Sequence, residues 1–186
     1  NGLVAEDKVY DGTTIASLAS GAFLDGVFLT DDVSLDLNAV SAQFANKDVV
    51  LDTNGDPTAK GVSVSGVTIS GTDQGNYTLT LPSVSDATIT PAAIRIVGLS
   101  VADKVYDGGT VADVQGTAQV FAIGADDVEL AGYSAGDTIT ASFGDASAGQ
   151  NKNVTISGLS LGGAQAGNYT LSGSLLGNIT PRQLTI

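Results

Sequence analysis

Four residue types are missing from this chain of 186 residues: cysteine, histidine, methionine and tryptophan. Without cysteine the chain has no disulfides, no thiolate metal ligands and no thiol nucleophile. Without histidine it also lacks the side chain that most often acts as a general base near neutral pH. Catalysis would depend on carboxylates alone, so we expect a protein that is not an enzyme, with no catalytic residues and no organic cofactor.

Positive charge is also scarce, with 7 Lys and Arg against 20 Asp and Glu, a net charge of −13. Such a chain repels nucleic acid and anionic lipid, so we expect neither as a partner. No apolar run approaches the roughly 20 residues that cross a bilayer, which argues against membrane insertion. No secretory signal is visible, so we expect a mature chain or a fragment. Aromatic residues are only 5% of the chain, so the core must be built from aliphatic side chains.

What the chain does contain is a duplication. Three motifs occur twice, in the same order and about 90 residues apart: Asp7–Gly12 and Asp103–Gly108, Gly75–Leu79 and Gly167–Leu171, and Ile89–Pro91 and Ile179–Pro181. Ordered matches at a nearly constant offset indicate two copies of one structural unit. Because the copies open at Gly2 and Gly98 and close at Ile96 and Ile186, the sequence predicts domains at 1–96 and 97–186.

The local pattern favours strands. Apolar and polar residues alternate in stretches such as Val33–Leu37 and Val154–Ile156, and the chain has 24 glycines for tight turns. Strict alternation is typical of half-buried antiparallel strands. We therefore predict an all-β protein of two tandem small antiparallel β domains. An immunoglobulin-like sandwich is favoured, and a β-grasp-like sheet with one short helix, which would lie within Thr14–Phe23, is the alternative.

The first recurring motif predicts a strand that ends in a turn. In Lys8, Tyr10, Asp11 and Gly12, the aspartate would accept backbone N–H bonds, the glycine would supply a positive φ, and the tyrosine would pack inward. The copy is formed by Lys104, Tyr106, Asp107 and Gly108. A binding role for both copies is the other interpretation of the motif.

The second recurring motif predicts a turn that leads into a buried strand. It contains Asn76 and Tyr77 in the first copy and Asn168 and Tyr169 in the second. Asparagine suits a turn because its side chain bonds to nearby backbone. The pairs Asp31-Asp32 and Asp126-Asp127 also recur, and we interpret them as solvated turn carboxylates.

One stretch without a counterpart suggests a metal site. Asp52, Asn54 and Asp56 have the oxygen-rich spacing that calcium prefers, although they lack the glycine and the distal glutamate of the helical calcium loop. Calcium is thus the one metal ion that the sequence predicts. Lys60 and Lys152 recur beside strands, and a covalent Lys–Asn bond is left open because the sequence shows residue types and not their proximity.

The ordered motifs Lys8–Thr14, Gly75–Leu79 and Ala87–Pro91 resemble the YDG repeat, and the related MBG repeat, of large bacterial exoproteins such as filamentous-haemagglutinin-like adhesins. The second copy departs from the pattern at Gly109, where the family usually has threonine. The resemblance covers nearly the whole chain. It implies tandem extracellular β domains on a bacterial surface protein, and it carries over no catalytic residue.

From this resemblance we expect a monomeric, extracellular spacer whose partners are neighbouring repeats of the same chain. The alternative is a module that binds a carbohydrate or a host surface protein through its loops. Carbohydrate sites usually present exposed aromatic rings, and Phe28, Phe121 and Tyr133 are the candidates here.

Overall fold

The computed structural model describes residues 2–186 and divides the chain into two compact units, Asn1–Pro91 and Ala92–Ile186. The division therefore lies after Pro91. The matching ends of the two copies had instead predicted a boundary after Ile96. The difference arises because Ala92–Arg95 forms a strand that pairs with Tyr169–Ser172 of the second unit. The sequence offset alone does not show with which unit a connecting strand pairs.

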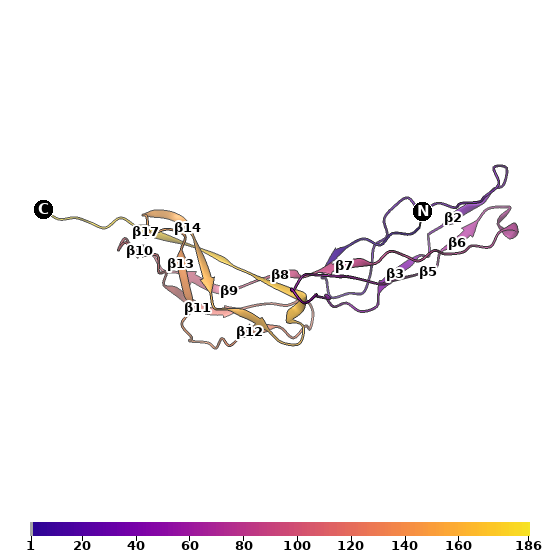
Figure 1. The fold of residues 1–186 in the computed structure, drawn as a ribbon. Helices are drawn as coiled ribbons and strands as arrows, with labels where there is room; N and C mark the ends of the chain where they lie inside the picture. Colours follow the sequence, from indigo (N-terminus) through magenta and orange to yellow (C-terminus); the bar gives the residue numbers. More distant parts are fainter. Residues whose placement is uncertain (1) are drawn as a thin grey trace. The chain divides into compact units, whose positions relative to one another are not determined.

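The strands are short in both units (Figure 1). In the first unit they are β1 (Lys8–Val9), β2 (Ser34–Asp36), β3 (Ser41–Phe44), β4 (Ala59–Lys60), β5 (Val62–Ser65), β6 (Thr68–Ser70) and β7 (Ala87–Thr90). In the second unit they are β8 (Ala92–Arg95), β9 (Val97–Val101), β10 (Lys104–Val105), β11 (Val114–Gln119), β12 (Glu129–Ala131), β13 (Thr140–Phe143), β14 (Gly149–Ser157), β15 (Ser160–Gly162), β16 (Tyr169–Ser172) and β17 (Ser174–Thr180).

The all-β prediction is confirmed: residues 2–186 contain no α-helix, only the 3₁₀ turns η1 (Gln74–Asn76) and η2 (Ala166–Asn168). The sheets are mixed, however, and not purely antiparallel as predicted. β1 runs parallel to β7, β10 to β17, and β16 to β8. Parallel neighbours need a long connection, and the return from β1 to β7 spans almost the whole first unit. The short helix of the alternative β-grasp-like fold was expected within Thr14–Phe23. The structure has isolated β-bridges there instead, at Ile15 and Leu18.

Equivalent strands pair in the same way in the two units. β3 pairs with β5 as β13 pairs with β14, and β2 pairs with β6 as β12 pairs with β15. The central sheet of the second unit has the order β10-β17-β14-β13, while in the first unit the order β1-β7-β4 stays separate from β3-β5.

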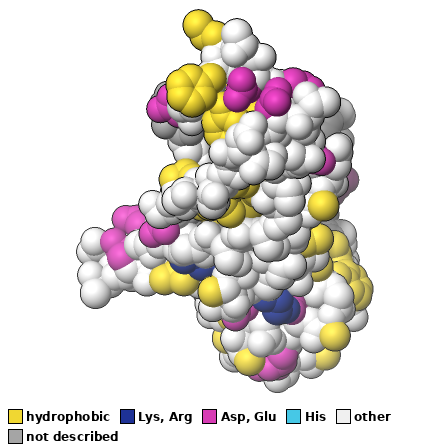
Figure 2. Space-filling model, turned by 90° about the vertical axis from the view of Figure 1, so that its right-hand side faces the viewer, with side chains coloured by type: hydrophobic (Ala, Val, Ile, Leu, Met, Phe, Trp, Pro, Cys, Tyr) yellow, Lys and Arg dark blue, Asp and Glu magenta, His cyan; other side chains and the backbone are white. Residues whose placement is uncertain are grey.

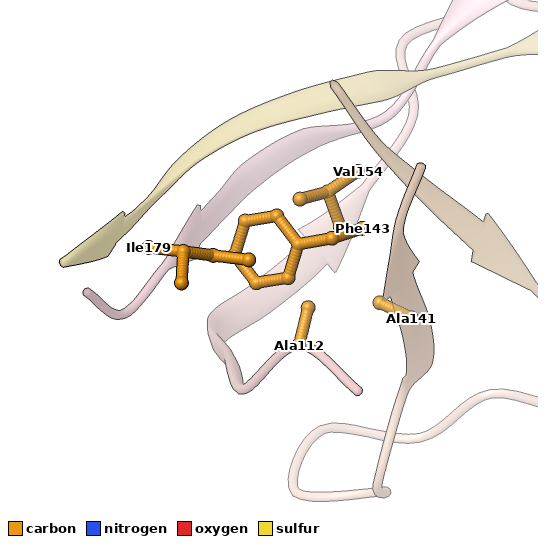
Figure 3. Packing of buried hydrophobic residues seen from close by; sticks show 5 residues of the cluster. All are labelled: Ala112, Ala141, Phe143, Val154 and Ile179. Carbon is orange, nitrogen blue, oxygen red and sulfur yellow. The ribbon is translucent and has the colours of Figure 1, made fainter. Parts of the chain in front are cut away.

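The core of each unit is built around one phenylalanine. In the second unit Ile179 and Ala112 point toward the ring of Phe143, with Val154 and Ala141 beside it (Figure 3). Phe44 and Ile89 are buried in the same way in the first unit. Alternation along β3 and β13 buries the second and fourth residues of each strand, which places both phenylalanines inward.

The surface carries the negative charge of the chain. On the face shown in Figure 2, acidic side chains occur at several places and basic ones at few. No helix within residues 2–186 is long and apolar enough to cross a bilayer.

Candidate functional sites

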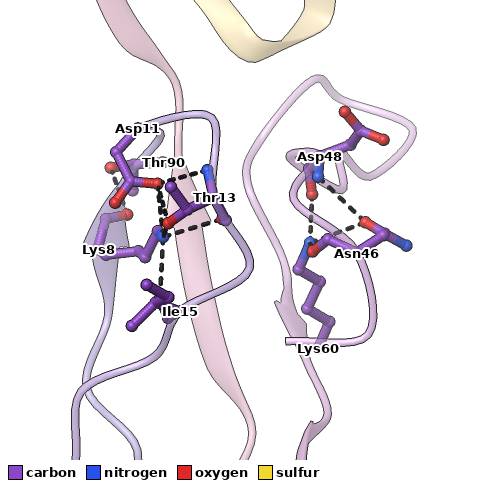
Figure 4. Close-up of polar contacts among 8 residues, drawn as sticks. All are labelled: Lys8, Asp11, Thr13, Ile15, Asn46, Asp48, Lys60 and Thr90. Atoms are coloured by element: carbon purple, nitrogen blue, oxygen red, sulfur yellow. Dashed lines mark hydrogen bonds and ion pairs between the residues drawn. The ribbon is translucent and has the colours of Figure 1, made fainter. Parts of the chain in front are cut away.

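The lysine of the first recurring motif closes the turn that follows it (Figure 4). The Nζ of Lys8 donates to the carbonyls of Ile15 at 2.9 Å and Thr13 at 3.1 Å, and lies 2.6 Å from the Asp11 carboxylate. Asp11 in turn accepts hydrogen bonds from the amide and the hydroxyl of Thr13, both at 2.9 Å. Gly12 has a φ of +79°. The motif thus satisfies its own polar groups within one turn.

The second copy repeats this arrangement with fewer contacts. The Nζ of Lys104 donates to the Val111 carbonyl at 2.9 Å and lies 3.0 Å from Asp107, which accepts from the Gly109 amide at 2.8 Å. Gly108 has a φ of +83°. Because glycine replaces the threonine of the first copy at position 109, the hydroxyl contact is lost.

Both turn aspartates have a pKa below the usual value. Burial raises the pKa of Asp11, but hydrogen bonds from Lys8 and Thr13 outweigh it and lower the pKa overall. The pKa of Asp107 is lowered first by the backbone hydrogen bond of Gly109 and then by Lys104. Both carboxylates are therefore ionised at neutral pH and act as acceptors in their turns.

The tyrosines of this motif differ between the copies. Tyr10 is 2% exposed, whereas Tyr106 is 42% exposed, so the prediction that both pack inward is wrong for Tyr106. The ammonium of Lys47 lies 5.6 Å from the centre of the Tyr10 ring. Counting from the core phenylalanines, Ala146 occupies the place of Lys47 in the second copy and is too short to reach a ring. The identical motifs therefore do not by themselves fix the exposure of their tyrosines, and the lysine beside one ring has no counterpart at the other.

The tyrosine of the second motif connects two distant parts of each unit. The Tyr77 hydroxyl donates to the Asp31 carboxylate at 2.7 Å and accepts from the Phe28 amide at 3.1 Å. In the second unit the hydroxyl of Tyr169 donates to Asp126 at 2.8 Å and accepts from the Ile123 amide at 2.9 Å.

The recurring aspartate pairs are therefore structural anchors as well as turn residues. Asp32 accepts from the Thr72 amide at 3.1 Å, and Asp127 accepts from the Ala164 amide at the same distance. The interpretation of these pairs as solvated carboxylates missed these partners. Their recurrence in step with the tyrosine motif was the available signal.

Around Tyr77 the balance of interactions raises the pKa of its hydroxyl. The hydrogen bond from the Phe28 amide lowers this pKa, but the bond to Asp31, burial and the charges of Asp31 and Asp73 outweigh it. The phenol stays protonated at neutral pH and serves as the donor of the bridge.

A second pair of lysines fastens another loop. The Nζ of Lys60 donates to the carbonyl of Asn46 at 2.8 Å, to its amide oxygen at 3.0 Å, and to the carbonyl of Asp48 (Figure 4). Lys152 makes an ion pair of 2.5 Å with Asp145, which occupies the place of Asn46. Lys60 and Asn46 are thus a lysine and an asparagine whose side chains the structure joins by a hydrogen bond.

Two lysines lie near one aromatic ring in the first unit. Lys60 is 5.4 Å and Lys8 is 5.9 Å from the centre of the Phe44 ring. Burial lowers the pKa of Lys60, Asp48 partly offsets this shift, and the charge of Lys8 lowers the pKa further. The recurring lysines therefore hold the loops around the core phenylalanine.

Comparison with known protein families gives a match to the YDG domain at residues 1–87 and again at residues 90–175. The chain belongs to the YDG domain family. No curated protein and no solved structure matches the chain. The two YDG units account for the duplication, and the match covers the turn and tyrosine motifs of both copies.

The predicted calcium turn forms an exposed hairpin in the first YDG unit. The Asp52 carboxylate accepts from the amides of Asn54 at 2.8 Å and Asp56 at 2.9 Å. These bonds lower the pKa of Asp52, that from Asp56 most. The carboxylate is thus engaged in the turn, and residues 2–186 contain no group of three acidic side chains suited to a metal ion. Calcium at this turn stays a prediction.

The structure brings two of the three candidate aromatic residues together. Phe121, 73% exposed, and Tyr133 line a pocket of about 410 Å³ in the second YDG unit, together with Glu129. The hydroxyl of Tyr133 accepts from the Ala118 amide at 3.0 Å. Phe28 lies in the first unit and is 74% exposed.

Proposed function

We propose that the chain is a non-catalytic extracellular repeat segment that acts as a spacer of a bacterial surface adhesin. The observation that supports this is the use of the recurring residues. Lys8 and Lys104 close turns, and Tyr77 and Tyr169 bridge to aspartates inside their own unit. What is repeated is therefore the scaffold, and a scaffold repeated in tandem is suited to adding length.

The composition is consistent with this role outside a cell. A net charge of −13 keeps a chain dispersed and repels other acidic surfaces. Turns closed by lysine and aspartate side chains need no disulfide, which suits a chain without cysteine.

A spacer has to be longer than a compact body of the same mass, and small-angle scattering measures this. Two YDG units end to end would have a radius of gyration of about 21–23 Å, against about 16 Å for one compact body of this length. We expect the larger value. A radius near that of a compact body would contradict the spacer role.

The pocket beside Phe121 supports a second candidate function, a loop-borne site for carbohydrate or a host surface protein. The exposed Phe121 ring could stack on the face of a sugar ring. The nearby carboxylate of Glu129 could accept hydrogen bonds from sugar hydroxyls. A glycan array on the purified chain tests this function. Binding that Phe121→Ala abolishes and Phe28→Ala leaves intact would support it, and no binding to any glycan would remove the carbohydrate form of the proposal.

A further inference from the structure

One exposed hairpin of the first unit has no counterpart in the second unit, and its tip has a reactive sequence. Asn54 is followed by Gly55, and both lie in the exposed stretch 51–56. An isolated β-bridge between Leu51 and Pro57 closes the hairpin. Among the asparagines within residues 2–186, only Asn54 is followed by glycine. The other asparagine before a glycine, Asn1, lies outside the described residues.

Asparagine is one of the chemically labile residues, and its neighbour controls the reaction. The backbone nitrogen of the next residue loses its proton and attacks the side-chain carbonyl carbon. A new C–N bond closes a succinimide ring, and the side-chain nitrogen leaves as ammonia. Water then opens the ring at either carbonyl, which gives aspartate or isoaspartate. A side chain on the next residue hinders the attack, and glycine has none.

The structure leaves the space around Gly55 open. Its φ is +87°, and no heavy atom lies within 4 Å of the position that a Cβ would occupy. Both Asn54 and Gly55 are exposed, so a ring formed there would extend into solvent. No buried side chain has to move for the reaction to occur.

The same turn holds the reacting groups apart from each other. The Gly55 amide donates to the carbonyl of Asp52 at 3.1 Å, and the side-chain amide of Asn54 donates to the Asp52 carboxylate at 3.3 Å. That carboxylate also accepts from the backbone amides of Asn54 and Asp56. Because these bonds hold both groups on Asp52, the turn has to open locally before the ring can close.

We propose that Asn54 is a site of spontaneous deamidation, and that Asp52 limits the rate by holding the turn closed. Either product replaces the donor to Asp52 by a second carboxylate, so an attraction becomes a repulsion between like charges. Isoaspartate also lengthens the backbone of the turn by one carbon. The reaction therefore adds negative charge to the hairpin of the first unit alone. This proposal does not rest on the spacer role.

Asn38 is a matched control in the same unit. It is exposed, and its backbone amide donates to the Asp36 carboxylate at 2.9 Å, as that of Asn54 donates to Asp52 at 2.8 Å. The residue after it is Ala39, whose Cβ hinders the attack. Asn38 should therefore stay intact under conditions in which Asn54 reacts.

The test is incubation of the full chain at mildly alkaline pH, followed by trypsin digestion and mass spectrometry. Cleavage after Lys47 and Lys60 releases residues 48–60, in which Asn54 is the sole asparagine. We expect this peptide to convert with time to two products of equal mass, aspartate and isoaspartate, which chromatography separates. The peptide that contains Asn38 should show no conversion at that residue. A sample digested without incubation corrects for conversion during digestion.

A second measurement tests the role of Asp52. Asp52→Ala should speed the conversion of Asn54 by about 3–10-fold, the change expected when hydrogen bonds that hold a turn closed are lost. Asp36→Ala removes the matching carboxylate beside Asn38 and should leave the rate at Asn54 unchanged. Thermal melting of both variants checks that the first unit stays folded.

Three results would overturn the proposal. If Asn54 stays intact in an incubation that converts it in the denatured chain, the fold protects the site. If Asn38 converts as fast as Asn54, exposure governs the reaction and the glycine does not. If Asp52→Ala leaves the rate unchanged, the carboxylate does not hold the turn closed.

Discussion

Tyr10 and Tyr106 stand in identical six-residue motifs, yet one is buried and the other is nearly half exposed. The turns that follow them are closed in the same way, by a lysine and an aspartate. One difference outside the motif is that Lys47 lies near the first ring, whereas the second unit has Ala146 at the matching place. A repeated motif therefore specifies its turn, and its surroundings specify its burial.

The tyrosines of the second motif also differ in burial, but here the buried one is in the second unit. Tyr169 is buried behind β8, while Tyr77 borders an open groove, although their hydroxyl bonds are equivalent. Each unit thus buries one of its two motif tyrosines, Tyr10 in the first and Tyr169 in the second, and leaves the other more exposed. Variants at matched positions can separate the contribution of the motif from that of its cover.

The largest expected difference is between Tyr10→Ala and Tyr106→Ala. Removal of a buried aromatic side chain typically costs about 3–5 kcal/mol, so the first variant should lower the free energy of unfolding of the first unit by that amount. The second variant should cost about 1 kcal/mol in the second unit, because its ring already contacts solvent. Denaturant unfolding of each variant measures both values. Equal losses at the two sites would break the comparison, and Tyr10→Phe serves as a control that removes only the hydroxyl.

Ile94→Ala tests which of the two units β8 stabilises. The side chain is buried and packs in the second unit, so the free energy of unfolding of that unit should fall by about 2–4 kcal/mol. The matched change Leu184→Ala should alter stability by less than about 0.5 kcal/mol, because this side chain is exposed. If Ile94→Ala lowers the free energy of unfolding of the first unit instead, β8 belongs to the first domain, as predicted from the sequence.

Lys47→Ala and Ala146→Lys should have effects of opposite sign. The first variant removes the ammonium from the Tyr10 ring, and a cation–π contact of this kind is worth about 0.5–1 kcal/mol. The second offers Tyr106 a comparable cover and should stabilise the second unit by a similar or smaller amount. Thermal melting of both variants measures the change. No gain from Ala146→Lys would show that a lysine at this place is not sufficient to cover the ring.

The smallest expected effect is a change in the stability of the second unit at low pH. The pKa of Asp145 lies below the usual 3.8, first because Lys152 donates a hydrogen bond to it and then because of the Ser147 amide. A carboxyl whose pKa is lower in the folded state stabilises the fold above its unfolded pKa, and this stabilisation is lost as pH falls through the folded pKa. The second unit should therefore lose stability below about pH 4, and Asp145→Asn should lose less over the same range.

The first unit has an asparagine at this place and supplies the comparison. Asn46→Asp should introduce an acid dependence that the first unit lacks at this position. Melting temperatures of wild type and both variants, from neutral pH to below the usual aspartate pKa, measure the difference. Identical pH profiles for Asp145→Asn and wild type would show that the exposed ion pair contributes nothing measurable.

The sequence by itself determined the features that depend on neighbours within a few residues. Alternation at Val33–Leu37 and Val154–Ile156 predicted strands that the structure contains, and the duplication predicted two units. The turns at Asp11-Gly12 and Asp107-Gly108 follow from a short acceptor side chain and a glycine that tolerates a positive φ. These are local properties of the backbone, so they can be read without knowing the fold.

Only the tertiary structure decided what depends on residues far apart. It assigned Ala92–Arg95 to the second unit, paired Tyr77 with Asp31, and covered Tyr10 but not Tyr106. These outcomes depend on which strand edges meet and on which distant side chains lie next to a ring. Identical motifs carry no information about either, because strand pairing and burial are set by partners tens of residues away.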